Sequence, residues 1–320
     1  AEYQRQRAEI QRRRPRSTLA QRQIAELLTT QHRYDEAVTL LEEAVREDPK
    51  DFAALSLLGS GYLRQGQDDK GLQMLQRAFR GDRFNVRTFN LLNLFEKVIP
   101  KGYVTVTVDL RRDRPGQGGL RLRLPESEKA LLLPLLVPLI QTEWQELVTR
   151  YGGEPPRPLT LELYSNPEHY AVRTVGLPGL AALGVTFGRV VTGRSPAQGA
   201  FNWGVMIWHE LSHVFAIHLS RSHLPRWFAE GLAEWETEHH DPDWTRRTHA
   251  ELYGALRSGQ LLPIEKLNAG GFTVAGLGNQ AHFHESYLPS PEHLLAVTDR
   301  FAKIVPHQAI TEYDVVRSEE

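Results

Sequence analysis

The chain has 320 residues, and its 38 lysine and arginine residues nearly balance its 39 aspartate and glutamate residues, so the formal net charge at pH 7 is −1. A balance so close to neutral argues against a nucleic acid or another polyanion as the main partner. The chain contains no cysteine, which excludes disulfide bonds and leaves the redox compartment open.

Residues 1–16 form a basic N-terminal extension. Its charged residues are Arg5, Arg7, Arg12, Arg13, Arg14 and Arg16, opposed by Glu2 and Glu9. Such a run can touch nucleic acid or an anionic membrane, but more often it is a solvated or disordered extension. We therefore expect no nucleic-acid partner.

Residues 17–99 repeat loosely with a period of about 34 residues, which is the period of tetratricopeptide repeats. Tyr34–Ala37 recurs as Gln67–Gly71, and a third unit begins near Val86 and is cut by Pro100. The matching positions are Ile24 with Leu58, Ala25 with Gly59, Leu28 with Tyr62, Ala37 with Gly71, Leu41 with Leu75 and Ala44 with Ala78.

Two and a half repeats are fewer than a free-standing solenoid prefers, so we expect this array either to pack on the following domain or to continue upstream. Two interpretations of its role stay open. The repeats can form a peptide-binding groove or adaptor for a protein partner, or they can serve as a structural cap.

The pattern then changes to strands. Tyr103–Val108 and Leu120–Leu124 alternate in hydrophobicity on either side of a Pro-Gly loop, which predicts a hairpin with one buried face. Residues 126–150 predict a helix. Its apolar part, Ala130–Ile140, is too short for a membrane span and contains two prolines, so we expect no integral membrane segment.

A further strand is predicted at Leu159–Tyr164, followed by a helix capped near Asn166 and by an edge segment, Val185–Val191. Together with the hairpin, these elements predict a small mixed sheet. The fold class expected for the whole chain is therefore α+β.

The segment His209–His213 carries the clearest chemical signal. Two imidazoles four residues apart lie on one face of a helix, so both can bind one metal ion while Glu210 points toward a bound water molecule. The apolar flanks Val205–Trp208 and Val214–Ile217 contain no proline or glycine and predict a long, largely buried helix. The segment is therefore a candidate metal site.

A proline-opened helix after residue 225 places Glu230 and Glu234 four residues apart on one face. A catalytic zinc ion takes three protein ligands and keeps a fourth position open, so either glutamate could be the third ligand. The other would then suit the second shell, where it would accept a hydrogen bond from the far ring nitrogen of His209 or His213.

Two other zinc motifs do not fit. A metzincin needs a glycine three residues after the second histidine and a third histidine three further on, but Ala216 and Leu219 occupy these positions. The inverted motif fails because Ser212 stands where its glutamate would be. The remaining histidines of this region, His218, His223, His239 and His240, are interpreted as exposed or second-sphere residues.

The segment Trp227–Gly231 resembles the Trp-x-x-Glu-Gly segment of the gluzincin metallopeptidases of peptidase clan MA. This resemblance implies that Glu230 is the third zinc ligand and Glu234 the acidic residue one turn later. Residues 159–267 are similar, more closely, to a bacterial peptidase subfamily of this clan that is often fused to tetratricopeptide repeats. The segments that carry this similarity are Leu180–Gly188, Phe201–Trp203, the Trp227 segment and Leu261–Pro263.

The resemblance also implies an oxyanion donor on a later helix, and two residues compete for that role. The family's tyrosine position falls on His282, while Tyr287 lies within reach of the same register. After Leu288 the chain departs from the family, because Pro289, Pro291 and Pro306 interrupt the expected helix.

Aminopeptidases of the clan carry a glutamate that grips the free amine of the substrate, but the matching segment Val185–Val191 has no carboxylate. An exopeptidase anchored to the amine is therefore not expected. A strand that pairs with an extended peptide main chain is compatible with this sequence.

The sequence thus predicts a basic extension (1–16), helical tetratricopeptide-like repeats (17–99), a zincin-like metallopeptidase domain (100–290) and a divergent C-terminal tail (291–320). The predicted function is zinc-dependent endopeptidase activity on peptides or proteins, with zinc-bound water activated by Glu210. The alternative is a tetratricopeptide scaffold whose zinc site is structural or silent. The compartment stays open, because the chain begins with alanine and an exported protein could have lost its leader.

Overall fold

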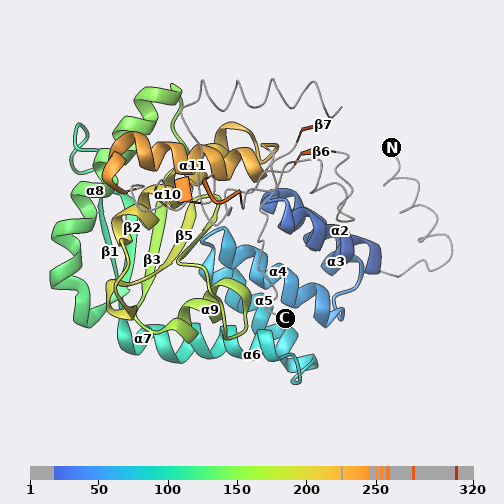
Figure 1. Cartoon of the computed structure of the whole chain (residues 1–320). Coiled ribbons are helices and arrows are strands. Elements are labelled where there is room, and N and C mark those ends of the chain that lie inside the picture. Colours follow the sequence, from blue (N-terminus) through green and yellow to red (C-terminus); the bar gives the residue numbers. More distant parts are fainter. Residues whose placement is uncertain are drawn as a thin grey trace. The chain divides into compact units, whose positions relative to one another are not determined.

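The computed structural model describes residues 18–224 and 226–244, together with residues 250, 253–254, 257–259, 276–277 and 307–308. The chain divides into two compact units, Ala1–Trp203 and Gly204–Glu320. It is an α+β protein with a repeat-like helical region at the N-terminus and a mixed sheet (Figure 1). The arginines of the N-terminal extension lie outside the described residues.

Four helices form the two predicted helical hairpins. They are α2 (Leu19–Thr30), α3 (Tyr34–Glu47), α4 (Phe52–Arg64) and α5 (Asp68–Gly81). The small residues of the repeat lie where α4 and α5 approach most closely, because a Cβ atom added at Gly59 would lie 2.9 Å from the carbonyl oxygen of Gly71. Glycine at these two positions therefore allows the close packing of the second hairpin.

The third unit differs from the expectation. After α6 (Val86–Asn93) the helical path continues through a π-helical segment, η1 (Leu94–Val98), and ends with α7 (Ile99–Gly102). Pro100 was expected to cut this unit, but it lies within α7, and the helical path continues to Gly102. The chain then enters the sheet directly.

The sheet has five strands in the order β1-β2-β3-β5-β4. They are β1 (Tyr103–Asp109), β2 (Gly119–Pro125), β3 (Leu159–Tyr164), β4 (Gly184–Phe187) and β5 (Val190–Arg194). The predicted β1–β2 hairpin is confirmed as an antiparallel pair. The pairs β2–β3 and β3–β5 are parallel, and β4 pairs with β5 in the antiparallel direction.

Two helices make the parallel connections. The helix α8 (Lys129–Tyr151), preceded by the short η2 (Glu126–Glu128), links β2 to β3, and α9 (Pro167–Val175) links β3 to β5. The side chain of Asn166 caps α9 by accepting hydrogen bonds from the backbone N–H groups of Glu168 and His169. The helix predicted for residues 126–150 and the cap at Asn166 are both confirmed.

The segment Val185–Val191 is not one edge strand, as the sequence analysis assumed. A turn at Gly188, which has a φ of +64°, divides it between β4 and β5. Glycine adopts this left-handed conformation without the penalty that a Cβ atom imposes. Of these two strands, only β4 therefore lies at an edge of the five-stranded sheet.

A buried ion-pair network joins the repeat helices to one face of this sheet. Arg123 of β2 donates to Glu162 of β3 and to Asp68 of α5, with both nitrogen–oxygen distances 2.6 Å. Arg173 of α9 donates to the same Glu162 at 2.6 Å and to the carbonyl oxygen of Leu63 of α4 at 3.0 Å. The repeats are thus bonded to the sheet, as the first of the two expectations proposed.

Burial disfavours a charged guanidinium, yet the pKa of Arg123 lies above its ordinary value because the carboxylates of Glu162 and Asp68 outweigh that penalty. The same holds for Arg173, where the charge of Glu162 offsets burial. Apolar packing surrounds the network, since Leu63, Leu75 and Phe95 of the helical part share one core with Tyr164 and Tyr170. Repeats and sheet therefore form one packed body.

The second unit contains the helix α10 (Trp203–Leu219), whose first residue lies at the boundary, and α11 (Arg226–His240), followed by the short η4 (Pro242–Trp244). Two short strands, β6 (Gly276–Leu277) and β7 (His307–Gln308), pair in parallel. Among the described residues, no helix combines the length and apolar character that a membrane crossing needs.

Candidate metal centre

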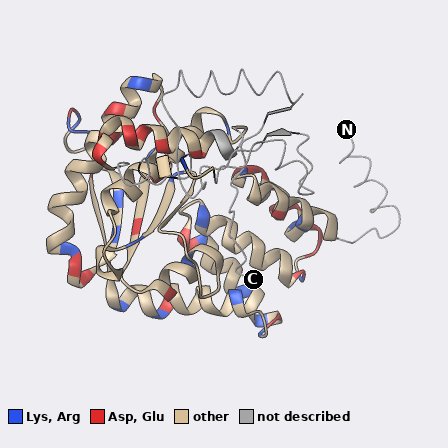
Figure 2. Cartoon of the chain, viewed as in Figure 1, with Lys and Arg blue, Asp and Glu red and all other residues tan. Residues whose placement is uncertain are grey.

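The first two candidate ligands lie on α10, the buried apolar helix that the sequence predicts. Trp208, Leu211 and Phe215 of this helix are each at most 1% exposed. His209 and His213 are four residues apart, so their rings emerge from the same side of α10. The third candidate lies on α11, a helix rich in acidic residues (Figure 2).

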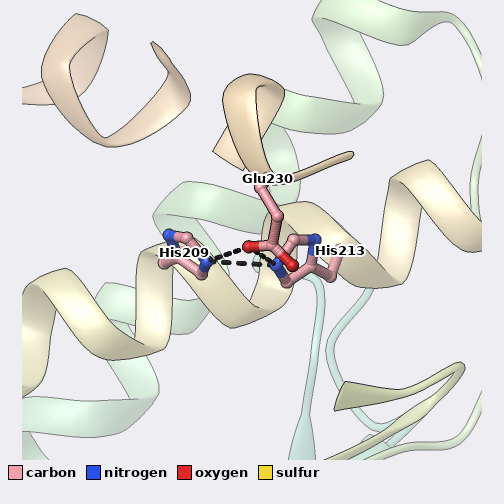
Figure 3. Close-up of side chains that lie close together, drawn as sticks. All are labelled: His209, His213 and Glu230. Carbon is pink, nitrogen blue, oxygen red and sulfur yellow. Dashed lines mark hydrogen bonds and ion pairs between the residues drawn. The ribbon is translucent and has the colours of Figure 1, made fainter. Parts of the chain in front are cut away.

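Three candidate ligand atoms from these two helices lie close together, and the side chains of His209, His213 and Glu230 point toward one another (Figure 3). The Nε2 atoms of His209 and His213 lie 3.0 Å apart, and each lies 3.2 Å from Oε2 of Glu230. Among the described residues, this is the one group of three or more histidine, aspartate or glutamate side chains that could hold a metal ion. Glu230, rather than Glu234, completes the triangle.

Glu234 lies on the other side of the His209 ring. Its Oε1 is 3.1 Å from Nδ1 of His209, and its side chain is 32% exposed, whereas that of Glu230 is 9% exposed. One imidazole therefore faces a different carboxylate with each of its nitrogens. The contact of Glu234 fixes the ring orientation and directs Nε2 toward Glu230.

The charges of this group are strongly coupled. Burial alone would lower the pKa of His209, but hydrogen bonds to Glu230 and Glu234 and the charges of these carboxylates raise it well above its usual value. Burial would raise the pKa of Glu230, but the charge of His213 and the hydrogen bonds from both imidazoles hold it well below its usual range.

The donor set and its spacing fit zinc. Two imidazole nitrogens and one carboxylate oxygen are among the commonest ligands of a catalytic zinc ion. Bonds of about 2.0–2.1 Å in a tetrahedral site separate the ligand atoms by about 3.3 Å, and the three distances observed are 3.0, 3.2 and 3.2 Å. A zinc ion held by these three residues would have a further position open to a water molecule or a substrate.

Glu210 follows His209 on α10 and is 7% exposed. A glutamate side chain is seldom buried to this extent unless it is paired. Glu210 lies next to the first candidate ligand, at the position predicted for the catalytic base. His282 and Tyr287, the two candidates for the oxyanion donor, lie outside the described residues.

The other histidines divide into two groups. His218, His223 and His239 are exposed, in agreement with the interpretation of the sequence. His240 is partly buried and stacks on Trp208, with ring centroids 3.5 Å apart. This contact could not be predicted, because its two residues are far apart in the sequence and match no motif. The position of Trp208 directly before the candidate ligand His209 was the one available signal.

Comparison with known proteins identifies one region. A family model described as tetratricopeptide repeat matches residues 28–89, from the end of α2 to the beginning of α6. No curated protein and no solved structure matches the chain. The match confirms the interpretation of the helical hairpins as tetratricopeptide repeats, a class of repeat that suggests protein partners, and the residues of the candidate metal centre lie outside it.

Proposed function

We propose that the chain is a zinc-dependent peptidase of the gluzincin type. The observation that carries the proposal is the triangle of His209, His213 and Glu230, with ligand atoms 3.0–3.2 Å apart and Glu210 beside the first histidine. A helix with two histidines and a carboxylate from the next helix are the parts that a zincin-like domain requires. The local resemblance of residues 227–231 to that family supports the same assignment.

Zinc bound there would act as a Lewis acid, lowering the pKa of a water molecule and polarising the carbonyl of the scissile bond. Glu210 would accept the proton of the attacking water and then return it to the leaving amine. Glu234 would hold the far nitrogen of His209, so that Nε2 keeps its lone pair for the metal. Glu210, Glu230 and Glu234 would thus have separate tasks: proton transfer, metal binding and orientation of His209.

An endopeptidase is favoured over an exopeptidase. The segment that would carry an amine-binding glutamate has none, since β4 and β5 contain only apolar, glycine, threonine and arginine residues. β4 is an edge strand of the five-stranded sheet, and an edge strand offers main-chain groups to an extended peptide. Recognition through the main chain suits cleavage within a polypeptide.

A scaffold is the second candidate, and the match to tetratricopeptide repeats at residues 28–89 favours it. In this alternative the repeats hold a protein partner, and the metal site is structural or silent. The two functions differ in one measurable property: a scaffold with a structural zinc ion binds metal but does not hydrolyse peptides.

The test uses the purified full chain. We expect about one zinc ion per chain by elemental analysis, and cleavage of an unselective peptide library detected by mass spectrometry. Glu210→Gln should keep the zinc and lose the cleavage, whereas Glu238→Gln, a control on α11, should retain both. A protein without stoichiometric zinc would show that the ligand assignment is wrong. A zinc-loaded protein that leaves the library uncut would favour the scaffold.

A further inference from the structure

A second cluster links the same two helices that carry the candidate metal ligands. The Trp208 ring of α10 stacks on the ring of His240, the last residue of α11, with centroids 3.5 Å apart and planes inclined by 18°. Trp244 of η4 closes the cluster, lying edge-on to Trp208 at 6.1 Å and tilted against His240 at 5.0 Å. We call these three residues the aromatic cluster.

The aromatic cluster lies close to one ligand along α10 and far from the other along α11. Trp208 directly precedes His209, whereas His240 follows Glu230 by ten residues, which corresponds to about 15 Å of helix. The two helices are therefore in contact at two well-separated points of α11. Two such contact points fix the rotation and the tilt of α11 against α10, whereas a single contact point would leave α11 free to pivot about it.

Hydrogen bonds at the end of α11 place Trp244 against the stacked rings of Trp208 and His240. The N–H of Asp241 donates to the carbonyl of Thr237 at 3.2 Å, the N–H of Trp244 donates to the carbonyl of Asp241 at 3.0 Å, and the Asp241 side chain accepts from the N–H of Asp243 at 3.0 Å. These bonds hold the short turn η4 against the helix end, so the third ring is placed by backbone bonds as well as by packing.

The indole of Trp208 contributes to this cluster by the stacking of its ring, and not by a hydrogen bond from its N–H group. The residue is fully buried, yet among the described residues its Nε1 has no hydrogen-bond partner. An unsatisfied buried N–H is destabilising, and stacking on His240 is an interaction that a smaller apolar side chain would not provide. The stacking of Trp208 on His240 therefore offsets the destabilising effect of the unsatisfied N–H group.

We propose that the aromatic cluster is a positioning device for the metal centre. It holds α11 so that Glu230 reaches both imidazoles and Glu234 reaches Nδ1 of His209. The proposal rests on the zinc site of the proposed function and adds to it the residues that set its geometry. Trp208, His240 and Trp244 are positioning residues, since none of them belongs to the ligand triangle.

The test compares zinc affinity in four forms of the full chain, measured by competition with a chromophoric chelator. His240→Ala removes the stack and should weaken zinc binding about tenfold, the effect typical of residues that orient metal ligands. His240→Phe keeps a stacked ring and should restore the affinity to within about threefold of the parent chain. His239→Ala is the matched control, because His239 is exposed and stacks on Trp235 instead.

A second measurement separates positioning from folding. The visible spectrum of the cobalt-substituted chain reports the coordination geometry, and it should change in His240→Ala but not in His240→Phe or His239→Ala. If His240→Ala unfolds, Trp244→Leu, which leaves the Trp208–His240 pair in place, should show a smaller change in the same direction.

The possible outcomes are distinct. Parent-like affinity and cobalt spectrum in a folded His240→Ala chain would overturn the positioning role and leave the proposed function intact. Equal losses in His240→Ala and His240→Phe would also overturn it, because they would show that the imidazole itself is needed. A parent chain that binds no zinc would overturn the proposed function and this inference together.

Discussion

Replacement of Glu162 by glutamine is the most informative test of how the repeats and the sheet are joined. The Glu162 carboxylate is 1% exposed and accepts hydrogen bonds from Arg123 and Arg173, both at 2.6 Å, and from the hydroxyl of Tyr164 at 3.2 Å. The substitution keeps the shape of the side chain but removes its negative charge. The buried guanidinium groups of Arg123 and Arg173 then lose the carboxylate charge that they share.

The magnitude follows from what each arginine retains. Arg123 keeps its ion pair with Asp68 at 2.6 Å. Arg173, which is 1% exposed, keeps its hydrogen bond to the carbonyl oxygen of Leu63 and only the more distant charge of Asp68. Leaving a buried charge uncompensated costs about 3–5 kcal/mol. For a body of this size, that loss lowers the melting temperature by about 10 °C.

Thermal unfolding followed by circular dichroism measures this effect in the full chain. Glu36→Gln is the matched control, because Glu36 also meets an arginine, Arg33, at 2.6 Å but is 52% exposed. An exposed pair contributes less than about 1 kcal/mol, so the control should shift the melting temperature by no more than about 3 °C. If Glu162→Gln melts within about 3 °C of the parent chain, the network does not hold the repeats to the sheet.

Three further predictions concern the metal centre and the repeats. The contacts that raise the pKa of His209 stabilise the metal-free fold fully below the ordinary histidine pKa, and this stabilisation is lost as pH rises through the raised pKa. Because zinc competes with the proton for the imidazole, zinc affinity should increase over that same pH range. Titration calorimetry in buffers of different ionisation enthalpy should accordingly show protons released on zinc binding. Glu234→Gln should weaken zinc binding about tenfold without changing the stoichiometry, whereas Glu230→Gln, which removes a ligand, should weaken it more; equal affinities in the two variants would contradict the assignment. Burial, together with a hydrogen bond to Glu42, raises the pKa of Tyr62 to about 12, so its stabilising effect should persist up to about pH 10 and fade as pH rises through 12. Tyr62→Phe should remove this pH dependence and cost about 1 kcal/mol in urea unfolding.

Local patterns in the sequence were sufficient for the elements whose residues are close together in the chain. The alternation of Leu120, Leu122 and Leu124 predicted β2 with one buried face, and these leucines are fully buried. The spacing of His209 and His213 predicted a shared helix face, and their Nε2 atoms lie 3.0 Å apart. In each case the helix or strand period alone fixes the relation between neighbouring side chains.

Relations between distant residues could not be predicted in this way. Thr160 and Glu162 alternate with leucines in β3, which normally indicates a solvent-facing side, yet every residue of β3 is buried. The reason is that α4, α5 and α9 cover that face and supply Arg173 and Asp68 as partners of the network. Similarly, the stack of Trp208 on His240 depends on how two helices cross, which no local period contains.

The same long-range contacts limit what the tetratricopeptide repeats can do. An adaptor that swivels freely would leave the carbonyl oxygens at the end of α4 in water, but Arg121 donates to Gly66 at 3.2 Å and Arg173 donates to Leu63 at 3.0 Å. A third contact, from Asn90 of α6 to the carbonyl of Gly176 at 3.0 Å, joins the next repeat helix to the end of α9. These three hydrogen bonds, at separate positions, fix the repeat helices relative to the sheet and α9. A protein partner bound to these repeats would therefore be held at a fixed position relative to the five-stranded sheet, and not on an arm that moves independently of it.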